Sequence, residues 1–123
     1  MTRFPVVAAA AVGALFLAAC GPLTPEAISR AWRNSYQEYS SLRAIAMSVC
    51  SYRRALDEAK QGGNPDIVSQ RTAYLLAQEQ QYAAVASRYD AAVRNPLDRG
   101  LTRPRDLPER APSLQEMTDS VCR

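Results

Sequence analysis

Apolar side chains recur every three or four residues over the first long stretch of the chain, which is the spacing of one face of a helix. Thr24, Pro25 and Glu26 supply an N-cap, a proline at the first helical position and an acidic first turn. We expect the helix to begin at Pro25 and to stop at Gly62 and Gly63, because glycine tolerates the left-handed cap. The alternating spacing predicts a helix that packs lengthwise against another helix. The positions of this stripe are Ile28, Trp32, Ser35, Tyr39, Leu42, Ala46, Val49, Arg53 and Leu56.

A second helical pattern follows directly. Asn64 and Pro65 repeat the start signals of a cap and a first-position proline. Asn95 before Pro96 predicts the end of the helix, because the residue before a proline avoids the helical conformation. A short loop between two long helices predicts an antiparallel hairpin over residues 25–95. The second stripe consists of Val68, Arg71, Leu75, Gln78, Tyr82, Val85, Tyr89 and Ala92.

The remaining residues, 96–123, form a tail that is rich in proline. The prolines predict an extended chain over residues 96–112. Ser113 and Glu116 have the spacing of a capping box, which predicts a short last helix through Val121. The expected fold class is therefore all-α, a long helical hairpin with a Pro-rich tail and a short C-terminal helix. The tail prolines are Pro96, Pro104, Pro108 and Pro112.

The start of the chain has the layout of a secretory signal peptide over residues 1–19. Arg3 and the terminal amine are positive, and no charge follows from Phe4 to Ala19. The segment ends in small residues, as such signals do. We expect these residues to be removed from the mature protein.

The motif Leu17-Ala18-Ala19-Cys20 resembles the lipobox of bacterial lipoproteins. The resemblance implies that a peptidase cuts before Cys20 and that this cysteine carries a thioether-linked diacylglycerol. A further acyl chain such as palmitate is often placed on the new amine in that class. Residues 20–24 are then a lipidated tether, and two or three acyl chains hold a protein stably on a membrane.

The resemblance also bears on localisation, in the bacterial cell envelope. In this class, an aspartate directly after the lipidated cysteine resembles a signal for retention in the inner membrane. This chain has Gly21 at that position, so the absence of the aspartate favours the outer membrane, with the protein facing the periplasm. An uncleaved membrane anchor is the main alternative, because the uncharged stretch from Phe4 to Pro25 is about as long as a membrane-spanning helix. An ordinary secreted protein is the third possibility.

Lipidation of Cys20 leaves Cys50 and Cys122, and two cysteines in an exported domain form a natural disulfide. The extended tail is long enough to bring the last helix back to the hairpin. We expect the short helix to dock there through this disulfide. The alternative is a pair of free thiols.

The composition and motifs argue against a catalytic, metal-binding or nucleic-acid-binding site. The chain has no histidine, the commonest general base and a common metal ligand. It has no Cys/His metal spacing and no Gly-rich phosphate loop. The net charge of +3 is small and mixed in sign, which is unlike a nucleic-acid-binding surface. We therefore expect no enzyme activity, cofactor, metal, nucleic acid or small-molecule substrate.

All six tyrosines lie in the two long helical patterns. Tyrosine is useful both in a thin helical core and in binding surfaces, because it is large, stiff and half-polar. The tyrosines on the stripes are expected in the core: Tyr39, Tyr82 and Tyr89. The tyrosines that flank the stripes are candidate contacts with a partner: Tyr36, Tyr52 and Tyr74.

These features predict a non-enzymatic adaptor, a lipid-anchored hairpin that presents a helical surface to an envelope protein or to another copy of itself. A second hypothesis is an inhibitor or exclusion factor that blocks an incoming enzyme, phage or conjugation apparatus. A third is a phage outer-membrane lysis subunit, since the Pro-rich tail has a passing similarity to outer-membrane spanins. The long hairpin departs from the spanin pattern.

Overall fold

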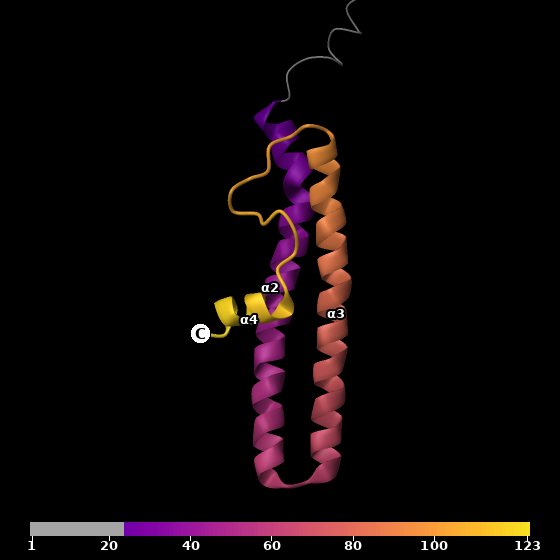
Figure 1. Ribbon diagram of the computed structural model, residues 1–123, viewed down its shortest axis with the longest axis vertical. Coiled ribbons are helices and arrows are strands. Elements are labelled where there is room, and N and C mark those ends of the chain that lie inside the picture. The colour runs from indigo at the N-terminus through magenta and orange to yellow at the C-terminus, as the bar shows by residue number, and fades with distance from the viewer. Residues whose placement is uncertain (1–23) are drawn as a thin grey trace, which may run out of the picture.

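The computed structural model describes residues 24–123, so the predicted signal peptide, the lipobox and most of the tether lie outside the described residues. Its elements are α2 (Pro25–Gly62), α3 (Pro65–Asp98) and α4 (Leu114–Val121). The two long helices run antiparallel side by side, and α4 lies across α2 near its middle (Figure 1). The predicted all-α hairpin with a short C-terminal helix is confirmed.

The helix starts and the turn follow the predicted local signals. The Thr24 hydroxyl accepts a hydrogen bond from the Ala27 N–H at 3.2 Å, which caps α2. Gly63 ends α2 in the left-handed region, with φ of 72°. The Asn64 side chain then accepts from the Asp66 N–H at 3.0 Å and begins α3. Local sequence therefore determines where the hairpin turns.

The end of α3 differs from the prediction by three residues. The helix continues through Pro96 to Asp98, so the hairpin covers more than residues 25–95 and the tail leaves at Arg99. Proline removes one backbone donor, but the Pro96 carbonyl still accepts from the Leu101 N–H at 3.1 Å. The Pro96 side chain is also buried. Burial and the remaining hydrogen bonds offset the conformational preference that predicted a stop at Asn95.

The tail returns along one side of the hairpin and forms a third layer (Figure 1). The Tyr89 hydroxyl donates to the Pro108 carbonyl at 2.5 Å, and the Tyr82 hydroxyl donates to the Pro112 carbonyl at 2.8 Å. Leu107 of the tail is fully buried. The tail is thus bound by its backbone and by an apolar anchor.

The disulfide holds the far end of the tail. Cys50 and Cys122 are paired, with their Cα atoms 6.0 Å apart. The predicted capping box is present, because Ser113 and Glu116 each accept from the other's backbone N–H. Met117 of α4 is buried against the hairpin. The predicted docking of the last helix is confirmed.

The core lies where the tail covers the hairpin. Between Cys50 and Gln81, only Leu56 is buried, so the hairpin is a bare helix pair towards its loop. The core side chains come from both long helices, the tail and α4: Trp32, Leu42, Ile45, Ala46, Val49, Tyr82, Val85, Tyr89, Val93, Leu107 and Met117.

Candidate interaction face

The tail divides the hairpin into a covered face and a face that it leaves free. The covered face carries the hydrogen bond from the Tyr36 hydroxyl to Asp106, at 2.7 Å. It also carries the Arg53 guanidinium, which donates to the Thr118 hydroxyl at 3.4 Å. These contacts place the tail along one side of the seam between α2 and α3.

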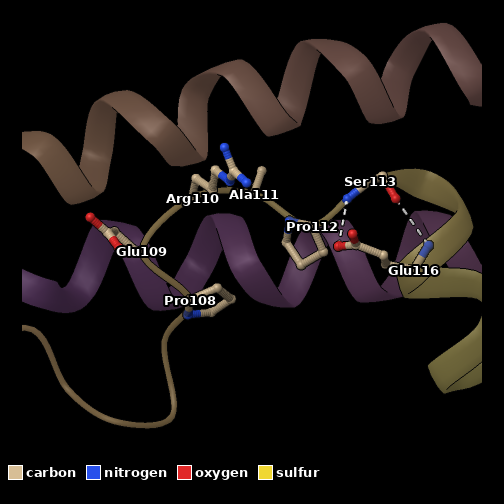
Figure 2. Close-up of a pocket in the computed structure, with 7 residues that line it drawn as sticks. All are labelled: Pro108, Glu109, Arg110, Ala111, Pro112, Ser113 and Glu116. Carbon is tan, nitrogen blue, oxygen red and sulfur yellow. Dashed lines mark hydrogen bonds between the residues drawn. The ribbon is translucent and has the colours of Figure 1, made fainter.

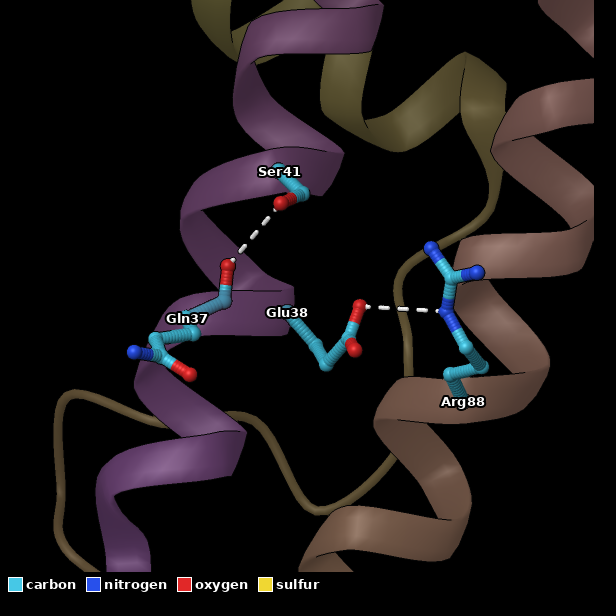
Figure 3. Close-up of polar contacts among 4 residues, drawn as sticks. All are labelled: Gln37, Glu38, Ser41 and Arg88. Carbon is cyan, nitrogen blue, oxygen red and sulfur yellow. Dashed lines mark hydrogen bonds and ion pairs between the residues drawn. The ribbon is translucent and has the colours of Figure 1, made fainter.

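An ion pair marks the opposite face. Glu38 of α2 and Arg88 of α3 approach to 3.4 Å across the seam. Figure 3 shows the two side chains reaching towards each other, with the tail on the far side of the hairpin. A pair this exposed contributes little stability. Because it joins α2 to α3, it shows which side of each helix belongs to this face.

Two rows of residues lead from this ion pair to the hairpin loop. Steps of three and four residues keep to one side of a helix, so the rows can be counted from Glu38 and from Arg88. The Tyr52 and Tyr74 ring centroids are 6.2 Å apart, which confirms that the rows lie side by side. We call these rows the open face. It consists of Ser41, Ser48, Tyr52, Ala55 and Ala59 of α2 with Ile67, Gln70, Tyr74, Ala77, Gln81 and Ala84 of α3, whereas Ile45, which has the same spacing, is buried in the core.

The open face contains no charged side chain, and it exposes apolar ones. Ile67 is 42% exposed and Tyr74 is 45% exposed. Arg71 borders it from the seam, where it is half-buried. Interface centres are depleted of charge and enriched in aromatic residues, and the open face has this composition. The same stretch of the hairpin places its charges elsewhere, at Arg43, Arg53, Arg54, Asp57, Glu58, Lys60, Asp66, Arg71 and Glu79.

The structure brings together two of the three tyrosines proposed as partner contacts. Tyr52 and Tyr74 pair on the open face, whereas Tyr36 lies on the covered face beside Asp106. The hydrogen bond to Asp106 raises the pKa of Tyr36 above its usual value. Its hydroxyl is thus engaged within the chain, and the contact role of all three tyrosines stays a prediction.

The tyrosines expected in the core occupy it or pack against it. Tyr82 and Tyr89 are buried, and Tyr39 packs on Tyr89 with ring centroids 5.9 Å apart. The hairpin therefore has one tyrosine pair on each face. Tyr89 of the first pair is buried beside the tail, whereas Tyr74 of the other pair is exposed.

Sequence reasoning missed the aliphatic and small residues of the open face, such as Ile67 and Ala77. The signal was present in the sequence, because counting in steps of three and four from Tyr52 and Tyr74 finds the same uncharged rows. The second stripe is less apolar than the core stripe of each helix, so its periodicity is the weaker signal.

A hollow lies beside the tail, where it leads into α4. Pro108 to Ser113 and Glu116 line it (Figure 2). The Glu116 carboxylate accepts from the Ser113 N–H at 3.3 Å, and the Ser113 hydroxyl accepts from the Glu116 N–H at 3.1 Å. These polar groups form the cap of α4, so they are already used in the fold.

Comparisons with known proteins do not identify a relative. The chain matches no protein-family model, no curated protein and no solved structure. Within residues 24–123, no helix has the length and apolar character to cross a membrane. The same part of the chain has no cluster of three or more acidic, cysteine or histidine side chains suited to a metal ion.

Proposed function

We propose that this chain is a small lipoprotein of the bacterial cell envelope that acts as a non-enzymatic adaptor. The uncharged open face, with Tyr74 and Ile67 exposed on a two-helix support, is the observation that carries the adaptor role. The motif that ends in Cys20 supports the lipid anchor, and Gly21 favours the outer membrane with the protein facing the periplasm.

The geometry suits a surface held at a distance from an anchor. Thr24 caps α2 four positions after Cys20, so the hairpin begins close to the lipidated residue. At 1.5 Å per residue, Tyr52 lies about 40 Å along α2 from Pro25. The free half of the hairpin can therefore meet an envelope protein away from the anchored end.

The anchor is tested by the intact mass of the chain extracted from bacterial membranes. We expect residues 20–123 plus acyl chains, with two alkylation labels added only after reduction, because Cys20 is then blocked and Cys50 is bonded to Cys122. An unacylated full-length mass with three alkylatable thiols would contradict the lipoprotein proposal and the disulfide.

The adaptor role is tested by photo-crosslinking in native membranes. A benzophenone amino acid replaces Tyr74 on the open face or, as the matched control, Tyr36 on the covered face. The two tyrosines are similarly exposed, at 45% and 42%. We expect a discrete covalent adduct at least tenfold stronger from position 74 than from position 36. Equal or absent adducts from the two positions would refute the open face as the contact surface.

A further inference from the structure

We infer that the open face binds a second copy of the same chain, so that two hairpins form a four-helix dimer. This inference rests on the proposed function, because it names the partner of the face that the adaptor uses. Three observations carry it: the Glu38–Arg88 ion pair at the border of the open face, the small side chains of the face, and the area of this side of the hairpin.

The charge pattern is self-complementary under a two-fold axis parallel to the hairpin. Such an axis places α2 of one copy opposite α3 of the other at the same height. Glu38 then faces Arg88 of the partner subunit, and the reverse contact follows by symmetry. The Arg88 side chain is 63% exposed and makes one bond to Glu38, so guanidinium donors remain for a second carboxylate.

The side chains between the ion pair and the loop suit close helix packing. Ser48, Ala77 and Ala84 are small, which lets two helix pairs approach closely. The same axis brings the Tyr52–Tyr74 pair of one copy against that of the other. Each helix then has only antiparallel nearest neighbours, as in an up-and-down four-helix bundle.

The area matches what a stable dimer needs. Residues 38–62 of α2 extend about 37 Å, and two adjacent helices are about 20 Å wide. The side of the hairpin that contains the open face, from Glu38 to the loop, therefore covers about 750 Å², close to the roughly 800 Å² per partner of a standard interface. Because these rows carry no arginine or lysine, an anionic membrane or an acidic protein is a poorer match.

The test is sedimentation equilibrium of the full chain, extracted from bacterial membranes in density-matched detergent. We expect a dimer for the wild type. Gln81→Arg should raise the dissociation constant at least tenfold, because the guanidinium would lie within the uncharged rows at the centre of the interface. Gln80→Arg is the matched control, since the adjacent exposed glutamine points to the edge of α3 and should leave the dimer unchanged.

Each outcome decides the inference. A dimer that weakens only with Gln81→Arg, together with a Tyr74-position adduct of twice the chain mass, supports it. A monomeric wild type that still forms a Tyr74-position adduct with another protein overturns the second copy and leaves the adaptor role. A monomer without an adduct overturns both. If both substitutions weaken the dimer equally, or if neither weakens it, the dimer forms through a surface other than the open face. This outcome overturns the inference.

Discussion

At the scale of single residues, two tyrosine hydroxyls hold the tail by its backbone. Tyr82 and Tyr89 donate to the carbonyls of Pro112 and Pro108, and their rings are buried in the core. Burial raises the pKa of each tyrosine to about 12. An unfolded tyrosine ionises near pH 10, so the folded state retains these protons at a higher pH.

Stability should therefore fall as the pH rises from about 10 to about 12, because the raised pKa favours the neutral hydroxyl only in the folded state. Tyr89→Phe should make this alkaline fall smaller, since one of the two buried tyrosines whose pKa is raised to about 12 is gone. At neutral pH the same change should cost about 1 kcal/mol, because the Pro108 carbonyl loses its donor. Urea unfolding followed by circular dichroism at pH 7 and pH 11 measures both effects.

Tyr74→Phe is the control for this experiment, because Tyr74 is exposed on the open face and its hydroxyl accepts from Gln70 of the same helix. It should keep the alkaline fall of the wild type. Equal unfolding free energies of the wild type at the two pH values would disprove the role assigned to the buried hydroxyls.

At the scale of elements, local chemistry predicted the helices and their turn. Thr24, Asn64 and Ser113 act within three residues of themselves, so the sequence is sufficient to identify them as caps. The end of α3 was not predictable in this way, because Pro96 is accommodated through burial under tertiary contacts. Helix boundaries are reliable where a cap decides them and unreliable where packing decides them.

The candidate site was predictable only in part, for a related reason. Helical spacing indicated that Tyr36, Tyr52 and Tyr74 lie off the main stripes. Which of these tyrosines has no contact with the tail depends on the path of the tail. That path is set by long-range contacts, which helical periodicity does not predict. Asp106 lies 70 residues from Tyr36 in sequence, and nothing near either residue predicts their hydrogen bond.

The tail is anchored to the hairpin by Leu107, which is fully buried and follows a turn that its N–H closes on the Pro104 carbonyl. Leu107→Ala should destabilise the fold by about 2–5 kcal/mol, the usual range for a large-to-small change in a core. Leu76→Ala on α3 removes the same atoms from a side chain that is 53% exposed, so its effect should stay within about 0.5 kcal/mol. Urea midpoints of the two variants make the comparison, and similar losses would show that Leu107 does not anchor the tail.

At the scale of the whole molecule, the disulfide joins residues separated by 72 positions. In the chain-entropy description, closing a loop of that length stabilises the fold by about 4 kcal/mol. The double variant Cys50→Ser/Cys122→Ser should lose about this much in urea unfolding. Dithiothreitol should lower the wild type to the same stability and leave the variant unchanged, whereas a wild type insensitive to the reductant would contradict the stabilising role.

The same crosslink determines how the molecule bears mechanical load. Tension applied between Thr24 and Arg123 travels along α2 to Cys50 and crosses directly to Cys122. The segment from 51 to 121, which contains α3 and most of the tail, lies outside this covalent path. Pulling on the two ends of the folded domain therefore strains the first part of α2, while the loop half of the hairpin keeps its shape under force.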